Sequence, residues 1–171
     1  MDIAELLGDC LGRVRDQVPG VVKGLDVDQL AWRPDERSNS LAWLVWHLTR
    51  VEDDHVAEVA GTEQVWTSAG WYERFGLPFP PTAHGWGHSA DDVARVVVEP
   101  DLLAGYHAET AARAIEYVGS LTPTDLDRIV DERWDPPVSL GVRLVSVVCE
   151  VNQHIGQAAY LRGLIERGHA S

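Results

Sequence analysis

Four long segments of this chain place apolar residues at helical spacing, and they constrain the fold more than any other feature. They cover residues 2–19, 41–60, 100–120 and 139–167. Apolar residues that recur three and four positions apart form a stripe along one side of a helix, and such stripes must be buried against each other. The sequence therefore predicts an all-α fold, a four-helix bundle, as a single domain over residues 1–171.

The connection between the second and third of these segments is long and broken by glycine and proline. It covers residues 62–98 and contains Trp66, Trp71 and Trp86. A long loop in a compact domain is usually functional or disordered, and this one has too many aromatic residues for disorder. We expect an irregular, Trp-rich insertion packed over one end of the bundle, with Val96–Val98 as its strand-like piece.

Composition and charge exclude several classes of function. The net charge is −13 and Lys23 is the only lysine, which disfavours binding to nucleic acid or to an anionic membrane surface. No apolar run is long enough to span a membrane, and the acidic N-terminal segment lacks the features of a signal peptide. We expect a cytoplasmic protein in which Cys10 and Cys149 are free and buried.

Three polar residues interrupt the apolar helices and form a candidate metal site. His47 lies at the edge of the stripe of residues 41–60, while Glu150 and His154 are four residues apart and share one face of residues 139–167. Two imidazoles and one carboxylate provide three protein ligands. A catalytic zinc site has this number of protein ligands and keeps a fourth position open for water or substrate. Iron, nickel and manganese accept the same ligands.

Other interpretations of these residues remain open at this stage. A histidine near a core is ordinarily a hydrogen-bonded structural residue, and Glu150 could pair with Arg143 without any metal. Glu52 and His55 form one Glu-x-x-His unit, but a di-iron bundle needs two such units. The remaining histidines are interpreted as loop residues (His84 and His88) or as solvated residues (His107 and His169).

Two stretches resemble a known superfamily. S-L-A-W-L-V-W-H-L at 40–48 and E-V-N-Q-H-I-G-Q-A-A-Y-L-R-G at 150–163 are similar to the DinB-like four-helix-bundle metalloproteins. W-D-P-P-V at 134–138 is also familiar from their branch of mycothiol S-transferases and mycothiol-dependent maleylpyruvate isomerase. The resemblance implies a homodimer with one divalent metal, zinc above all and nickel, manganese or iron as alternatives, on His47, Glu150 and His154.

The resemblance also implies a chemistry, the transfer of a small thiol to an electrophile in detoxification, with mycothiol as co-substrate. Trp66, Trp71, Trp86 and Trp134 would stack on the sugar of mycothiol, or else cover the bundle end as hydrophobic residues. Arg143 would steer a polar substrate at the mouth of the site. One alternative is a mycothiol-dependent isomerase of the maleylpyruvate type, which the carboxylate ligand favours and the chain length disfavours. A second is a non-enzymatic, dimeric, stress-linked metal-binding protein.

Overall fold

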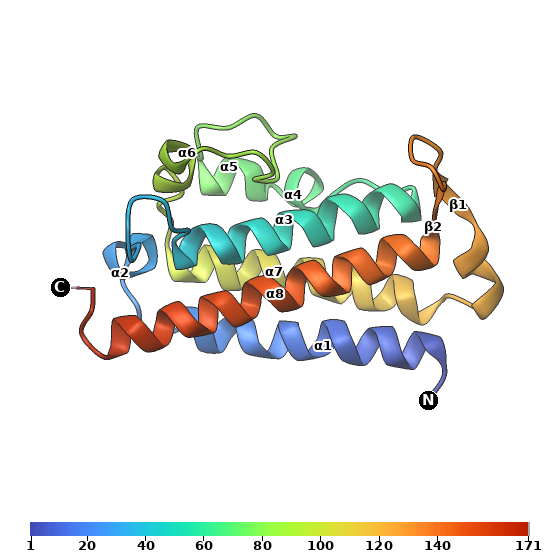
Figure 1. Cartoon of the computed structure of the whole chain (residues 1–171), viewed down its shortest axis with the longest axis horizontal. Coiled ribbons are helices and arrows are strands. Elements are labelled where there is room, and N and C mark those ends of the chain that lie inside the picture. The colour runs from blue at the N-terminus through green and yellow to red at the C-terminus, as the bar shows by residue number, and fades with distance from the viewer. Residues whose placement is uncertain (171) are drawn as a thin grey trace.

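Four long helices form a bundle in the computed structural model, which describes residues 1–170. They are α1 (Ile3–Val22), α3 (Leu41–Ala60), α7 (Pro100–Gly119) and α8 (Leu140–Glu166). Helices α3 and α1 each pack against both α7 and α8. Figure 1 shows α1 and α8 running in one direction and α3 and α7 in the other. The predicted all-α bundle is confirmed, and α3 and α8 are antiparallel neighbours.

The ends of the helices follow from capping residues that the sequence displays. The side chain of Ser40 accepts a hydrogen bond from the backbone N–H of Trp43 and begins α3. Gly61 ends the same helix in the left-handed conformation, with φ of 69°. Ser139 caps α8 in the way that Ser40 caps α3, by accepting from the N–H of Val142. These caps fix where the two site-bearing helices start.

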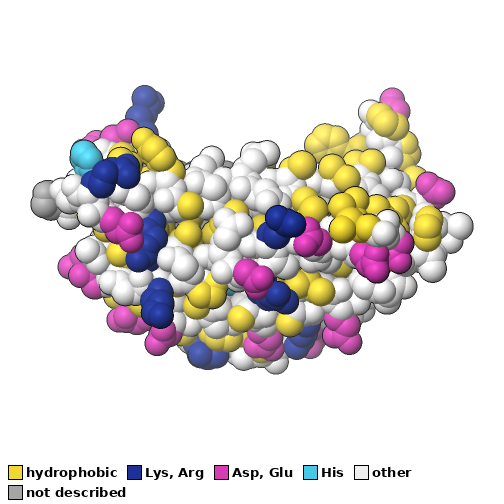
Figure 2. Space-filling view, turned by 90° about the horizontal axis from the view of Figure 1, so that it is seen from below, with side chains coloured by type: hydrophobic (Ala, Val, Ile, Leu, Met, Phe, Trp, Pro, Cys, Tyr) yellow, Lys and Arg dark blue, Asp and Glu magenta, His cyan; other side chains and the backbone are white. Residues whose placement is uncertain are grey.

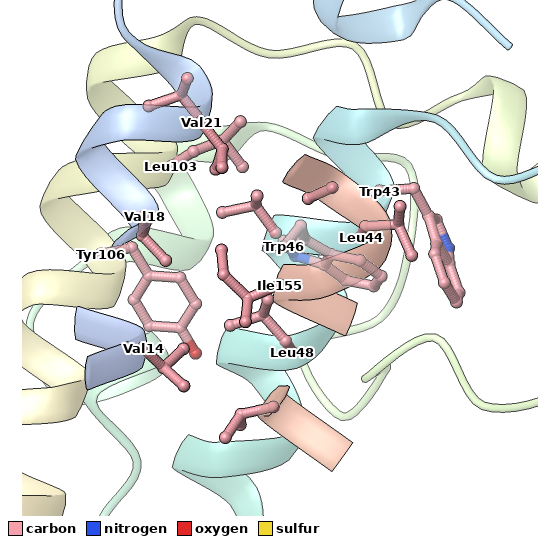
Figure 3. Packing of buried hydrophobic residues seen from close by; sticks show 14 of the residues in the cluster. Val14, Val18, Val21, Trp43, Leu44, Trp46, Leu48, Leu103, Tyr106 and Ile155 are labelled. Atoms are coloured by element: carbon pink, nitrogen blue, oxygen red, sulfur yellow. The ribbon is translucent and has the colours of Figure 1, made fainter. Parts of the chain in front are cut away.

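The core lies along the axis of the bundle and draws on all four long helices. Figure 3 shows aromatic and aliphatic side chains from α1, α3, α7 and α8 meeting there. All of the following are buried: Val14, Val18, Leu44, Trp46, Leu48, Leu103, Tyr106 and Ile155. Interdigitated packing of this kind holds α3 and α8 rigidly side by side, which gives side chains at their contact fixed positions.

The long connection between α3 and α7 is an irregular insertion, as predicted. It contains three short helices, α4 (Val65–Ser68), α5 (Trp71–Phe75) and α6 (Ala90–Ala94), and lies over α3 in Figure 1. The prediction of a strand at Val96–Val98 is wrong. Val96 and Val98 are buried and Val97 is exposed, the alternation of a strand, but this segment pairs with no strand in residues 1–170.

The remaining short elements connect the long helices. They are α2 (Val27–Ala31), the 3-10 helix η1 (Pro123–Asp127) and two antiparallel strands, β1 (Ile129–Asp131) and β2 (Val138–Ser139). The two strands pair on either side of the Pro-rich connector that precedes α8. They place Asp131 at the beginning of α8, beside the groove between α3 and α8.

The surface agrees with the exclusions drawn from composition. On the face shown in Figure 2, lysine and arginine side chains are scattered among acidic ones rather than gathered in a patch. No helix within residues 1–170 is both long and apolar enough to cross a membrane. Both cysteines are free, as expected, but the expectation of burial is wrong, because Cys149 is exposed on α8 and Cys10 is only half-buried.

Candidate metal centre

The fold brings together the three residues that the sequence singled out. Nε2 of His47 lies 3.1 Å from Oε1 of Glu150, and Nε2 of His154 lies 3.0 Å from the same oxygen. The three candidate ligand atoms all lie within 4.8 Å of one another. His47 is buried, while the side chains of His154 and Glu150 are 15% and 31% exposed. The candidate site is therefore buried on the side of α3 and accessible to solvent on the side of α8.

Hydrogen bonds on the far side of each imidazole fix its orientation. Nδ1–H of His47 donates to the backbone carbonyl of His84 in the insertion. Nδ1–H of His154 donates to Oε1 of Gln157, one helical turn further along α8, at 2.7 Å. When Nδ1 carries the proton of a neutral imidazole, Nε2 carries the lone pair. Both lone pairs then point towards Glu150.

This arrangement leaves three hydrogen-bond acceptors facing one another. Burial lowers the pKa of His47 and favours its neutral form, in which Nε2 is an acceptor. Two imidazole lone pairs and a carboxylate oxygen repel each other unless a cation or a proton lies between them. A divalent metal fits this donor set, because N and O donors of this kind are ligands for zinc and the outer hydrogen bonds are those that orient metal-bound histidines.

The insertion closes tightly over His47 from outside the bundle. The ring of Trp43 stacks on that of His47, with centroids 4.5 Å apart, and its Nε1–H donates to Nδ1 of His88 at 3.2 Å. The backbone of Gly85 passes so close that a Cβ there would lie 2.6 Å from Nδ1 of His47. Gly85 also has φ of +97°. Only glycine permits both this conformation and this approach.

We expect Gly85→Ala to weaken metal binding by about 10- to 100-fold, because the added methyl group displaces the carbonyl that orients His47. Gly87→Ala is the matched control, since Gly87 also has a positive φ, of +77°, but open space around its Cβ position. Titration of both variants with zinc measures the loss of metal affinity, and a denaturation curve for each variant measures any loss of stability. Equal zinc affinity in the two variants would show that the approach to His47 does not matter.

A buried arginine anchors the segment that carries His84. Arg50 is fully buried and donates from Nε to the carbonyl of Ala83 at 3.0 Å and from Nη2 to that of Pro81 at 3.3 Å. Its Nη1 donates to the hydroxyl of Tyr106 on α7 at 3.1 Å. Arg50 therefore positions the His84 carbonyl, and through it His47. Sequence reasoning missed this role, and an arginine inside the apolar stretch after His47 was the available signal.

A hollow opens beside the candidate ligands, along the groove between α3 and α8. It has a volume of about 250 Å³ and is lined by His47, Val51, His55, His84, Trp86, Ser146 and Glu150. Trp86 is 84% exposed, so its ring is free to cover a bound molecule.

Arg143 does not pair with Glu150, so the alternative in which these two residues form an ion pair without a metal is wrong. Its Nη2 lies 3.1 Å from Oδ2 of Asp131 on β1, and its Nη1 lies 3.5 Å from Nδ1 of His55. The carboxylate that pairs with Arg143 is that of Asp131, on the antiparallel pair of strands β1 and β2. The sequence alone could not place it near Arg143. Glu150 is left to the two histidines.

The tryptophans fall into two groups. Trp66 packs against Tyr106 and Trp71 against the same ring, and both indoles are buried between the insertion and α7 rather than facing the hollow. The structure therefore gives these two the role of hydrophobic cover, and does not bring them to the metal centre. Trp134 is 66% exposed in the connector between β1 and β2. Trp86 is the tryptophan that lines the hollow.

One histidine expected in solvent lies in the core instead. His107 on α7 is 1% exposed, and Nδ1 lies 3.1 Å from the hydroxyl of Thr49. Glu52 lies beside it, also 1% exposed, with neither carboxyl oxygen hydrogen-bonded within residues 1–170. Burial, and then the charge of Asp53, raise the pKa of Glu52 to about 8, while burial lowers that of His107 to about 4. Nδ1 of His107 lies 3.8 Å from Oε2 of Glu52, and both pKa shifts favour the neutral form of these side chains.

The chain is similar to known proteins in sequence and in fold. A family model described as mycothiol-S-transferase matches residues 6–167. Among solved structures, a conserved protein from Enterococcus faecalis is similar, with a TM-score of 0.89 and 31% sequence identity over 96% of this chain and 97% of that one. Among curated proteins, none matches.

Proposed function

Since this chain belongs to the mycothiol S-transferase family, we propose that it transfers a small thiol, mycothiol, to an electrophile with the help of a divalent metal. His47, Glu150 and His154 are the proposed ligands, and zinc is the proposed metal. The observation that carries the proposal is the convergence of three acceptor atoms within 4.8 Å at the wall of an open hollow. We further propose that the protein acts as a cytoplasmic homodimer and detoxifies electrophiles.

The chemistry that such a metal supplies is the deprotonation of a thiol. A free thiol has a pKa near 8.5 and is mostly protonated at neutral pH, and a bound cation stabilises the nucleophilic thiolate. Gln157 and the His84 carbonyl hold the two imidazoles in the orientation that presents Nε2 to the hollow. Trp86 would exclude water from the reacting sulfur, and Arg143 would contact the polar part of the substrate from further along the groove.

Zinc is expected to stabilise the folded protein strongly. A ligand that binds only the native state adds about 4 kcal/mol at a concentration 1,000 times its Kd, which raises the Tm of a protein of this size by about 8–16 °C. Thermal unfolding of chelator-treated protein with and without zinc measures this shift. His154→Ala should abolish it, since only one imidazole and Glu150 remain. An unchanged Tm in the wild-type protein would show that zinc does not bind the native state and would contradict the proposed metal site.

The reaction itself is tested with mycothiol and a bromobimane as electrophile. Metal-loaded protein should form the conjugate at a rate proportional to its zinc content, and chelation should remove the activity. The carboxylate ligand Glu150 favours a second candidate, a mycothiol-dependent isomerase of the maleylpyruvate type. Isomerisation of maleylpyruvate that needs mycothiol, with no conjugation of the bromobimane, would replace the transferase by this candidate.

A further inference from the structure

A second hollow, larger than the one beside the metal centre, opens between α8 and the connection from α2 to α3. It has a volume of about 770 Å³, and sites for small molecules typically enclose about 300–1,000 Å³. None of the three candidate metal ligands lines it. Its wall on α8 is formed by residues three or four positions apart, which share one face of the helix: Gln153, Gly156, Gln157, Tyr160, Leu161 and Leu164.

A hydrogen bond separates this second hollow from the candidate metal centre. Nε2 of His154 faces Glu150 at 3.0 Å, whereas Nδ1, on the opposite side of the ring, bonds to Oε1 of Gln157. Gln157 lines the second hollow. A molecule bound there therefore meets the outer partner of a candidate ligand and not the side of His154 that faces the metal position. Its occupant is distinct from the two reactants, which the proposed reaction brings together at the metal.

The wall of the second hollow carries a positive charge without a negative one. Arg37 is exposed there, and its guanidinium makes no hydrogen bond or ion pair within residues 1–170. None of the described residues in the wall is acidic, although acidic residues outnumber basic ones by 27 to 14 in the whole chain. The neighbouring Asp35 accepts from the backbone N–H groups of Arg37 and Ser38, both at 2.8 Å. An anion in the hollow would therefore gain attraction from Arg37 without facing a carboxylate in the wall.

Neutral amide groups add further hydrogen-bond donors. Oε1 of Gln157 accepts from His154, which leaves the N–H groups of the same amide available to a ligand. The side-chain amides of Asn39 and Gln153 also line the hollow and are bonded to no other part of residues 1–170. A planar guanidinium beside several neutral donors suits a single carboxylate, whose two oxygens accept from both kinds of group.

The rest of the wall is apolar and leaves room for a ring system. Leu44 and Leu161 are buried, and Tyr160 is 65% exposed, so its ring is free to cover an apolar body. A Cβ at Gly156 would have no atom within 4 Å. Glycine weakens a helix relative to alanine, and no contact within the chain requires it at this position. What the absent side chain provides is space in the hollow.

We propose that the second hollow binds a small amphipathic carboxylate as an effector, and that its occupation is coupled to the metal centre through Gln157. Arg37 and the amides hold the carboxylate, while Leu44, Leu161 and Tyr160 contact the apolar body. A carboxylate that accepts from Gln157 fixes the amide that orients His154, and such outer hydrogen bonds tune metal affinity. The ligand site stands on the second hollow alone, whereas the coupling rests on the proposed metal site.

Binding is tested without any metal, by calorimetric titration of 2-naphthoate into chelator-treated protein. We expect 2-naphthoate to bind, and its uncharged analogue 2-naphthamide to bind at least about fivefold more weakly. Arg37→Gln should remove this preference for the carboxylate, and Gly156→Leu should abolish binding of both probes by filling the hollow.

The matched controls are Arg95→Gln and Gly20→Leu, since both residues are exposed and lie outside the second hollow. Gly20 also lies in a helix and has open space around its Cβ position, as Gly156 does. Both controls should bind 2-naphthoate like the wild-type protein. Absence of binding to the wild-type protein would overturn the assignment, as would wild-type affinity in Arg37→Gln or Gly156→Leu.

Zinc titration with and without saturating 2-naphthoate measures the coupling. We expect zinc affinity to rise by about fivefold with 2-naphthoate present, and 2-naphthoate affinity to rise by the same factor with zinc present, because coupling between two sites is reciprocal. In Arg37→Gln the zinc affinity should be the same with and without 2-naphthoate. If 2-naphthoate binds but leaves zinc affinity unchanged, the coupling is wrong and the ligand site stands. If 2-naphthoate binds but zinc does not, the ligand site stands and the proposed metal site is wrong.

Discussion

His47→Ala is expected to lose stoichiometric zinc and to lower the rate of mycothiol conjugation by more than about 100-fold. Loss of a residue that only orients a ligand typically costs 10- to 100-fold in metal affinity, and His47 is proposed as a ligand itself. Without its Nε2, only Glu150 and His154 remain, both from one helix. Elemental analysis of the purified variant and a conjugation assay measure the two losses.

Two further variants separate this effect from damage to the fold. His47 is buried and bonded to the insertion, so its removal also destabilises the loop above it. His154 is partly exposed and its Nδ1 contacts only Gln157 on the same helix, so His154→Ala should lose zinc with a smaller change in stability. His169→Ala, at an exposed histidine, serves as the control. Full zinc content and activity in His47→Ala would refute the proposed ligand set.

The second large effect is expected in the core rather than at the metal. Glu52→Gln should stabilise the protein increasingly as pH rises. Glu52 has a pKa of about 8 when folded, against 4.5 for a free glutamate, so the folded state keeps its proton while the unfolded state releases it. Between pH 5 and pH 7 the advantage of the variant should grow by about 2.5 kcal/mol, or about 5–10 °C in Tm.

Glu52 and His107 make the stability of the protein change with pH in opposite directions. The raised pKa of Glu52 means that the stability it contributes is complete below about pH 4.5 and is lost as pH rises to about 8. His107 acts in the opposite direction, since its pKa is lowered to about 4 and stability is lost as pH falls from about 6.5. His107 is present in both proteins, so the difference between them isolates Glu52. Burial of the amide introduced by Glu52→Gln has a free-energy cost that does not vary with pH. This cost therefore does not affect how the stability difference between the two proteins changes with pH.

Chemical denaturation of the wild-type protein and Glu52→Gln at several pH values provides the measurement. Glu116→Gln is the control, because Glu116 is exposed on α7. A difference between Glu52→Gln and the wild-type protein that stays constant from pH 5 to pH 8 would show that Glu52 is not held neutral by burial.

Local rules were sufficient to predict the four long helices and the residues that the candidate metal site brings together. Helical spacing places Glu150 and His154 on one face of α8, and the apolar stripe directs His47 towards the core. These inferences depend only on neighbours along one helix. The resemblance of residues 40–48 and 150–163 to a known superfamily implied that His47, Glu150 and His154 share one site, and the structure brings these three residues together.

Contacts between distant segments were beyond the sequence. Glu150 could have paired with Arg143, which lies on the same helix, but Asp131 on β1 binds Arg143 instead. The sequence left open whether Trp66 stacks on a sugar or covers the bundle end as a hydrophobic residue. Asp53 on α3 binds the backbone N–H of Trp66 at 2.8 Å, and its indole is buried in the core. His107 was expected in solvent because no local pattern reveals which helix covers α7. Long-range packing decided each of these positions.

We propose that the sulfur of the thiol binds a metal held by His47, Glu150 and His154. Replacement of zinc by cobalt(II) makes this visible, because a thiolate bound to cobalt gives a charge-transfer absorption in the near ultraviolet. Addition of mycothiol to the cobalt protein should produce this band, and S-methyl mycothiol, which cannot form a thiolate, should not. A cobalt spectrum that is unchanged by saturating mycothiol would contradict the account.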